Sequence, residues 1–284
     1  MKKFKETKEK NWILKSHDTD ESLNKVKEIS DELGINPIIA KLLYSRGYTD
    51  VASAKSFIYM ESEMLSNPFL MKDMELGIKR VMSAIENGEK ITIYGDYDVD
   101  GVTSVCTIYL YLKSKGADVE YYIPNRAGEG YGVSCAAIDS IGEAGTKLII
   151  TVDTGITANE EVEYAKSLGI DVIVTDHHEC RSELPNAVAV INPHRPDCEY
   201  PFKELAGVGV VFKVITAVEF LLQEREIFGQ ADGALTYGER YTRMLESGES
   251  SEFVAYSTMK CIADSLKKSI KFAKKCEKTM FTNC

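Results

Sequence analysis

One stretch, residues 91–104, constrains the fold of this chain more than any other: it reads Ile-Thr-Ile-Tyr-Gly-Asp-Tyr-Asp-Val-Asp-Gly-Val-Thr-Ser. Its β-branched start predicts a strand, and three carboxylates follow at alternate positions, Asp96, Asp98 and Asp100. A segment with helical spacing comes next. Carboxylates this close repel one another unless a cation or protons lie between them. Because open α/β sheets hold ligands where a strand ends before a helix, the stretch predicts a site for a hard metal ion.

Two other structures are compatible with these residues. A solvated acidic turn is a common structure for sequences rich in Asp and Gly, and it stays open on this stretch alone. The pattern Asp-x-Asp-x-Asp-Gly also matches the first six positions of a calcium-binding EF-hand loop. The twelfth position of such a loop should be Glu and is Thr107 here, and the residues before Asp96 favour a strand. The EF-hand is therefore disfavoured.

From Lys90 onward, strands and helices alternate. The expected strands are 91–94, 119–123, 147–152, 171–175 and 187–191, and the helices between them are 102–115, 134–143 and 158–168. Thr157-Ala-Asn-Glu160 is a capping-box pattern before the last of these helices. The alternation predicts an α/β fold with a doubly wound, mostly parallel sheet flanked by helices.

The chain divides into three expected segments. Residues 1–88 form an arm rich in Lys and Glu and then a helical lead-in, with helices at 22–33, 36–47, 51–59 and 73–87. Residues 89–222 form the α/β domain, and residues 223–284 are expected to be loop-rich with short helices and a basic end. Gly34 and Gly47 mark helix ends, and Asn36-Pro37 marks a helix start.

Polar residues follow the other expected strands too. Asp153 follows one strand, Asp176-His177-His178 follow another, and Asn192-Pro-His194-Arg195 follow a third. Parallel strands end at one edge of a sheet, so these groups should lie close together. Carboxylates with one or two imidazoles suit Mn²⁺ or Mg²⁺, and two such ions would activate a bridging water and clamp a phosphoryl group.

Asp98, Asp100, Asp153 and His177 are the expected ligands of a two-ion centre. For His178 and Asp96, direct ligation and a supporting role that orients a ligand both stay open.

Composition limits the compartment and the partners. The chain has 284 residues, a net charge of −10 and seven cysteines without a Cys-x-x-Cys pair. These cysteines indicate a reducing, cytoplasmic environment and argue against a disulfide framework and a structural zinc site. No apolar run approaches the roughly 18 residues of a membrane span, and no signal peptide is expected. The negative charge lowers the expectation of nucleic-acid binding by bulk attraction without excluding a local basic track.

Several motifs together resemble the DHH phosphoesterase superfamily, and within it the RecJ-like exonucleases specific for single strands. The principal ones are Gly95-Asp-Tyr-Asp-Val-Asp-Gly101, Val152-Asp-Thr-Gly155 and Thr175-Asp-His-His178. Further matches are Tyr122-Ile-Pro-Asn-Arg126 with Glu129-Gly-Tyr-Gly132, Ile191-Asn-Pro-His-Arg195, and Leu205–Lys213, a helix. The resemblance covers about residues 30–222.

The resemblance implies a metal-dependent hydrolase that cuts single-stranded DNA from its 5′ end with two Mn²⁺ (or Mg²⁺) ions. A single-strand-binding protein is a candidate partner. Asp98, Asp100, Asp153 and His177 would be ligands, with His178 in the catalytic group. Arg126 and Tyr131 would bind the terminal nucleotide, since Arg makes bidentate phosphate contacts and Tyr offers a stacking face. His194 and Arg195 would lie near the scissile phosphate.

The family pattern weakens after Lys213. A fourth aspartate is expected there, and its best match is Asp264 in Cys261-Ile-Ala-Asp264. The family's second domain, which forms the other wall of the substrate cleft, has no counterpart in these residues. Two alternatives therefore stay open. One is a phosphoesterase for small substrates, such as short oligonucleotides, cyclic dinucleotides or pyrophosphate. The other is a non-catalytic single-strand-binding or scaffold protein.

Overall fold

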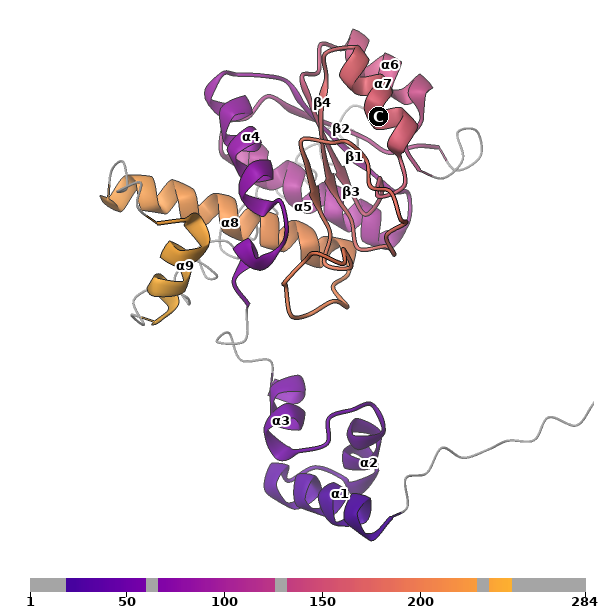
Figure 1. Cartoon of the computed structure of the whole chain (residues 1–284), viewed down its shortest axis with the longest axis vertical. Coiled ribbons are helices and arrows are strands. Elements are labelled where there is room, and N and C mark those ends of the chain that lie inside the picture. Colours follow the sequence, from indigo (N-terminus) through magenta and orange to yellow (C-terminus); the bar gives the residue numbers. More distant parts are fainter. Residues whose placement is uncertain (1–18, 60–65, 126–131, 229–234, 247–284) are drawn as a thin grey trace, which may run out of the picture. The chain divides into compact units, whose positions relative to one another are not determined.

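The computed structural model describes residues 19–59, 66–125, 132–228 and 235–246 (Figure 1). The chain divides into two compact units, Met1–Met64 and Leu65–Cys284. In the first unit, three helices, α1 (Asp20–Leu33), α2 (Pro37–Ser45) and α3 (Val51–Tyr59), enclose a small core of Ile29, Ala40, Leu43 and Ala54.

Local signals fix the helix ends of the first unit. Thr19 and Ser22 form a capping box at the start of α1, and Gly34 ends α1 in the left-handed conformation, at φ 62°. Asn36 caps α2, and Pro37 is its first residue. The sequence predictions of these helices, including Val51–Tyr59, are confirmed to within a few residues.

The second unit is built on a five-stranded parallel sheet. Its strands are β1 (Ile91–Gly95), β2 (Val119–Tyr122), β3 (Leu148–Val152), β4 (Asp171–Thr175) and β5 (Ala189–Ile191), in the order β2-β1-β3-β4-β5. The chain moves outward from β1 to β2 and then returns past β1 to β3. The strand order therefore reverses between β1 and β3, where sheets of this kind open a ligand crevice.

The register of the sheet aligns the ends of four of its strands, β1, β3, β4 and β5. Gly95 pairs with Val152, Val152 with Thr175, and Thr175 with Ile191. The residues that follow these four are Asp96, Asp153, Asp176 and Asn192. Pairing between strands thus brings four polar side chains together at one edge, although they are spread over 97 positions of the sequence, from 96 to 192 inclusive.

Helices cover both faces of the sheet, as the alternation of strands and helices predicts. On one face α4 (Met74–Glu86), α5 (Val99–Ser114) and α8 (Gly207–Phe228) share a core with alternate strand residues such as Ile91, Ile93 and Ile150. On the other face α6 (Cys135–Glu143) and α7 (Asn159–Ser167) pack on Ile149, Val172 and Val174. Figure 1 shows the strands between these two layers. The α/β prediction is confirmed.

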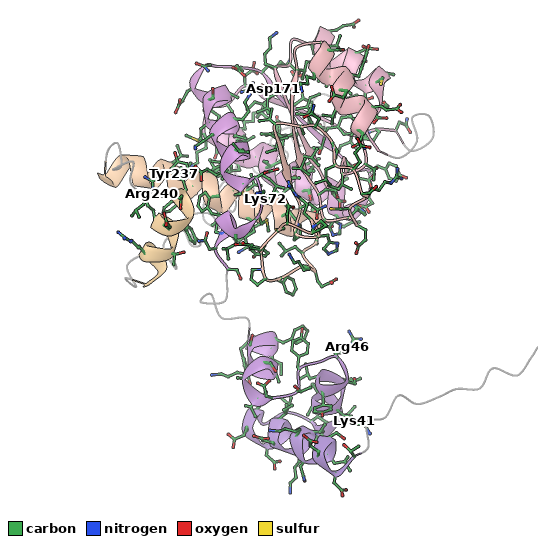
Figure 2. The ribbon with its side chains drawn as sticks, in the orientation of Figure 1. Lys41, Arg46, Lys72, Asp171, Tyr237 and Arg240 are labelled. Carbon is green, nitrogen blue, oxygen red and sulfur yellow. The ribbon has the colours of Figure 1, made fainter. Side chains whose placement is uncertain are left out.

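The helix α4 belongs to the second unit, although the predicted boundary lay at residue 88. Met74, Ile78 and Val81 are buried in the core of the sheet. On the same helix, Arg80 donates to Asp171 at the start of β4, with 2.6 Å between Nε and Oδ2; Asp171 is labelled in Figure 2. The division between the two units therefore falls 24 residues earlier, at Met64 and Leu65.

Of the expected C-terminal segment 223–284, the structure describes residues 223–228 and 235–246. The helix α8 continues to Phe228, and α9 (Tyr237–Glu246) packs on the short 3-10 helix η2 (Pro68–Leu70). Asn67 donates to the Gly238 carbonyl, and Arg240 lies over the Tyr237 ring, 4.4 Å from its centroid (Figure 2). None of the helices in the described ranges combines the length and apolarity needed to cross a bilayer.

Candidate metal centre

The three aspartates after β1 lie in three different environments. Asp96 is buried and accepts from the backbone N–H of Tyr97 at 2.7 Å. Asp98 is exposed and caps α5 by accepting from Gly101 N at 2.9 Å. Asp100, in the first turn of α5, accepts from Gly207 N at 2.7 Å and from Val208 N at 2.9 Å. A solvated acidic turn does not describe this arrangement, because Asp96 is buried and Asp100 is bound to the start of α8.

Asp153 lies at the centre of the group. Its side chain is buried, and its backbone is left-handed at φ 58°. A non-glycine residue in that region carries strain that often marks a functional constraint. Burial raises the pKa of Asp153 to about 8, and the neighbouring carboxylates of Asp100 and Asp98 act in the same direction. A cation beside this carboxylate would remove that cost.

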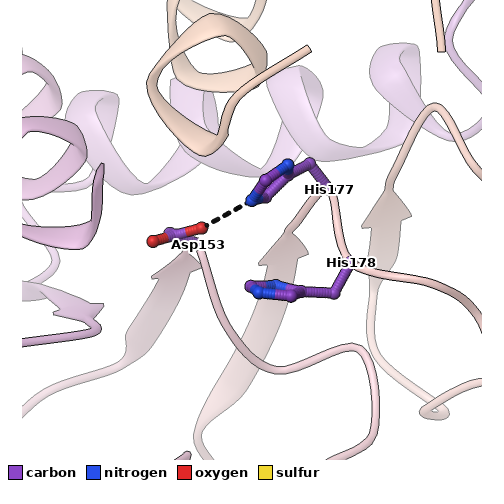
Figure 3. A group of neighbouring side chains, drawn as sticks. All are labelled: Asp153, His177 and His178. Atoms are coloured by element: carbon purple, nitrogen blue, oxygen red, sulfur yellow. Dashed lines mark ion pairs between the residues drawn. The ribbon is translucent and has the colours of Figure 1, made fainter. Parts of the chain in front are cut away.

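Two histidines approach Asp153 from the end of β4 (Figure 3). His177 Nε2 lies 3.0 Å from Asp153 Oδ1 and 3.6 Å from Asp100 Oδ2. The first pair is close, yet Asp153 Oδ1 is buried without a hydrogen-bond partner among the described residues. A buried oxygen in that condition is costly unless something else, such as a metal ion, satisfies it.

His178 is held by Asp176, a residue that the predictions did not include in the site. The two side chains meet at 2.7 Å between Nδ1 and Oδ1. Because the Asp176 carboxylate accepts, Nδ1 donates in this contact, and Nε2 is the nitrogen that a metal ion could bind once it has lost its proton. The hydrogen bond to Asp176 raises the pKa of His178 to about 9.

Asp176 itself is buried, and both of its carboxylate oxygens accept hydrogen bonds. Burial acts to raise its pKa, but hydrogen bonds from the His178 ring and from the N–H groups of Ile156 and His178 lower it overall. Asn192, also buried, donates to the His178 carbonyl at 2.9 Å. The sequence placed both residues at this edge of the sheet, since each follows its strand directly, but it did not predict their contacts with His178.

The ligand-type atoms form two overlapping groups. Asp153, His177 and His178 make one, Asp96, Asp98 and Asp153 make the other, and the atoms of each group lie within 4.8 Å of one another. Asp153 is common to both. Carboxylate oxygens with imidazole nitrogens match the preferences of Mn²⁺ and Mg²⁺, so the residues present fit divalent cations of this kind, with Asp153 available to both groups.

The positions of Asp96 and Asp100 can be compared with the ligand roles that the sequence predicted for them. For Asp96 both direct ligation and a supporting role were open, and its carboxylate lies with those of Asp98 and Asp153. Asp100 was expected as a ligand, and both of its oxygens accept from the first turn of α8. Its 3.6 Å separation from His177 keeps it at the edge of the group.

The two residues expected near the scissile phosphate behave differently from each other. His194 Nδ1 lies 3.4 Å from Glu179 Oε1 without forming a hydrogen bond. Arg195 donates to Asp73, to Asp197 and to the Val190 carbonyl, and its side chain is only 8% exposed. These contacts indicate that Arg195 ties the end of β5 to the start of α4, and a contact of Arg195 with substrate stays a prediction. Arg126, Tyr131 and Asp264 lie outside the described residues.

A groove of about 360 Å³ opens beside His178. The loops after β2, β3 and β4 line it, and its residues include Gly132, Thr154, Thr157, His178 and Arg181. It lies at the same sheet edge as the ligand groups. Its lining is mixed: Val133 and Ile156 add apolar surface, and Arg181 lies in it with Glu161 and Glu179.

Comparison with known proteins places these features in a family. The model of the DHH family, N-terminal domain, matches residues 90–238. The single-stranded-DNA-specific exonuclease RecJ of Bacillus subtilis is 48% identical over 207 residues, covering 73% of this chain and 26% of the relative. The Escherichia coli protein of that name is 39% identical over 200 residues, covering 70% and 34%.

Solved structures agree with this match. RecJ from Thermus thermophilus in complex with Mn²⁺ superposes with a TM-score of 0.55 and 26% identity, covering 71% of this chain and 28% of that one. Exonuclease RecJ bound to manganese gives a TM-score of 0.50 and 27% identity, covering 67% and 47%. The chain spans about a quarter to a third of the length of these curated relatives.

Proposed function

This chain belongs to the DHH family, and on that premise we propose that it carries the metal-binding part of a nuclease that removes nucleotides from the 5′ end of single-stranded DNA. The observation that carries the proposal is the buried Asp153 carboxylate, shared by two ligand groups and with one oxygen lacking a hydrogen bond among the described residues. The relatives that are named as single-stranded-DNA-specific exonucleases support the substrate class.

The proposed ligands are Asp153, His177 and His178 for one Mn²⁺ (or Mg²⁺) and Asp96, Asp98 and Asp153 for the second. Asp100 would complete the centre beside His177. Asp264 remains a proposed further ligand from the family pattern. Bound at this edge, the ions would supply an activated water and a clamp on the phosphoryl group.

The residues of the chain prepare the site for that chemistry. Asp176 orients the His178 ring, and Asn192 holds the backbone of His178 from the neighbouring strand. Outer partners of this kind typically contribute about 10–100-fold to metal affinity. The buried position of Asp153 keeps water from screening the carboxylate, which strengthens its attraction for a cation.

We propose that the groove beside His178 receives the terminal nucleotide. Gly132 lines the groove, and the chain just before it carries Tyr131 and Arg126. An Arg would pair with a phosphate and a Tyr would stack on a base. His194 and Arg195 remain proposed contacts of the scissile phosphate. A single-strand-binding protein as partner and a cytoplasmic location are proposals that follow from this substrate.

The test is a Mn²⁺-dependent digestion of labelled DNA by the full chain. Single strands with a 5′-phosphate should be shortened from that end, while duplexes resist. Asp153→Ala should abolish the digestion. Digestion that persists in Asp153→Ala, or that needs no divalent metal, would refute the proposed centre.

A second function is favoured by one observation, the net charge of −10. An acidic chain attracts long polyanions poorly, and that suits a phosphoesterase for dinucleotides or other small substrates. A dinucleotide assayed beside a long strand separates the two functions. Faster cleavage of the dinucleotide selects the small-substrate enzyme, and strand binding without product under any metal selects a scaffold.

A further inference from the structure

The start of α8 lies directly against the metal centre. Gly207 and Val208 are its first two residues, and the Ala206 carbonyl accepts the first helical hydrogen bonds, from Gly209 N and Val210 N. The N–H groups of the first turn have no partner within a helix. Here Asp100 accepts from two of them, at 2.7 and 2.9 Å.

Two helix N-termini therefore meet at the acidic cluster. Asp98 caps α5, and Asp100 joins the first turn of α5 to the first turn of α8. The positive ends of the two helix dipoles reduce the repulsion between the carboxylates. This explains how the carboxylates can be held near one another before any cation binds.

Gly207 contacts Asp153 from this helix start. A Cβ at position 207 would lie 2.7 Å from Asp153 Cβ, 2.7 Å from Oδ1 and 2.9 Å from Cγ. Each of these distances is shorter than a real Cβ atom tolerates. Gly207 is not among the glycines with positive φ, so its backbone would accept an alanine. Proximity to Asp153 is thus the reason for a glycine here.

Neither partner can move away cheaply. Asp153 is fixed by its left-handed backbone and by its N–H, which donates to the Thr175 carbonyl at 3.1 Å. The helix α8 is fixed by four apolar residues that are buried in the main core, Val210, Val211, Val214 and Ile215. A methyl group at position 207 would therefore press on Asp153 Cβ as well as on its carboxylate, so the carboxylate would turn and the end of β3 would have to shift with it.

We propose that Gly207 is a positioning residue of the metal centre: its bare Cα lets α8 begin in contact with Asp153 and so sets the orientation of the carboxylate shared by both ligand groups. This inference rests on the proposed metal-dependent function. It assigns the Leu205–Lys213 motif a role that the sequence did not predict.

The chain contains a matched control two residues further along α8. A Cβ at Gly209 would meet Leu205 Cδ2 at 3.2 Å, which is the far end of a flexible side chain, and the next two nearest atoms, at 3.5 and 3.8 Å, also belong to Leu205. Gly207→Ala and Gly209→Ala add the same methyl group to the same helix turn. Both gain helix propensity, so a difference between them reports on the contact with Asp153.

The experiment measures Mn²⁺ affinity of the full chain by calorimetry and by electron paramagnetic resonance of free Mn²⁺, without DNA. Gly207→Ala should bind Mn²⁺ at least about tenfold more weakly than the unsubstituted chain, the lower end of the effect of outer partners, and Gly209→Ala should stay within about twofold. Thermal unfolding of the metal-free variants checks that both are folded. Equal affinity in Gly207→Ala and the unsubstituted chain would overturn the inference. Absence of Mn²⁺ binding by the unsubstituted chain would instead refute the proposed function.

If Gly207→Ala fails to fold, an NMR measurement on the unsubstituted chain tests whether α8 begins beside the bound metal. Bound Mn²⁺ broadens the NMR signals of nearby nuclei. The amide signals of Gly207 and Val208 should broaden at the same Mn²⁺ concentration as those of Asp153 and His177. Broadening at Asp153 and His177 with sharp signals at Gly207 and Val208 would show that α8 does not begin at the bound metal, and the inference would be wrong.

Discussion

Two aspartates, one in each unit, show how the same residue type acts as a cap in one place and as a candidate ligand in another. In the first unit, Asp50 precedes α3, is exposed, and accepts from Ser53 N at 2.8 Å and from Ser53 Oγ at 2.9 Å. In the second, Asp153 follows β3, is buried, and has an oxygen without a hydrogen-bond partner among the described residues.

Their pKa values shift in opposite directions. The hydrogen bonds from Ser53 lower the pKa of Asp50, whereas burial raises that of Asp153 to about 8. A carboxylate that water and N–H groups satisfy stabilises a fold by itself. A carboxylate that is buried and unsatisfied costs free energy in the metal-free protein, and a cation can compensate for that cost.

The largest expected effect comes from Asp153→Ala. Losing the carboxylate shared by both ligand groups should weaken Mn²⁺ binding by more than the roughly 10–100-fold typical of outer partners, and it should abolish digestion. Calorimetry and the DNA assay measure these effects. If Asp153→Ala still bound Mn²⁺ tightly and still digested DNA, Asp153 would not be a ligand, and it would not differ from Asp50 in this respect.

Metal affinity should rise with pH between about 6 and 8, because two proposed ligands must lose a proton to bind a cation: Asp153, whose pKa is raised to about 8, and His178, whose pKa is raised to about 9. Each of these protons weakens binding by up to about tenfold per pH unit below the pKa of its group, so the affinity should fall by more than about a hundredfold from pH 8 to pH 6. Calorimetry in buffers of different ionisation enthalpy measures both the affinity and the proton released. An affinity that does not change with pH would contradict the raised pKa.

The same pKa has the opposite consequence for the metal-free fold. The folded pKa of Asp153 lies above the ordinary value of 3.8, so this group stabilises the fold most below about pH 4, and that contribution is lost as the pH rises toward 8. Asp153→Asn is neutral throughout. Its stability relative to the unsubstituted chain should increase over this range, and denaturant unfolding at acidic and at mildly alkaline pH in a chelator checks the sign.

Asp176→Asn should have an intermediate effect. The substitution removes the charge that fixes the His178 tautomer, and we expect a loss of about 10–100-fold in Mn²⁺ affinity with the fold retained. Titration of the His178 ring by NMR provides an independent check, because its pKa should fall from the raised value of about 9. An unchanged His178 pKa would show that the 2.7 Å contact does not control this ring.

The smallest effect is expected at Asp50. Asp50→Ala removes a helix cap and should destabilise the first unit by about 1 kcal/mol without changing metal binding or digestion. Thermal unfolding and the Mn²⁺ titration measure the two properties. A loss of Mn²⁺ affinity in this variant would mean that the two units do not act separately.

The sequence predicted features that depend on neighbouring residues. Asn36-Pro37 and Gly34 mark helix ends because their signals are local, and the β-branched residues of 91–94 and 171–175 identified two strands to within one residue. The capping box predicted at Thr157 to Glu160 is wrong. The N-cap of α7 is Ala158, without a side-chain hydrogen bond, because Asp176 accepts from Ile156 N and fixes that loop from another strand.

Within the site, the sequence predicted which residues converge but not their arrangement. Asp98, Asp153 and His177 follow strands and were expected at one edge, and they meet there. The attachment of Asp100 to α8 and the contact of Gly207 with Asp153 join residues that are far apart in the sequence. No local periodicity reports such contacts, and only the packed sheet and α8 define them.

The central proposal, that Asp153 would serve both ions of a two-ion centre, is tested most directly by electron paramagnetic resonance of the chain titrated with Mn²⁺. We expect two ions per chain, a spectrum with the exchange coupling of a bridged pair, and the loss of that coupling in Asp153→Ala. Binding of a single ion, or of two uncoupled ions that Asp153→Ala leaves in place, would contradict the claim.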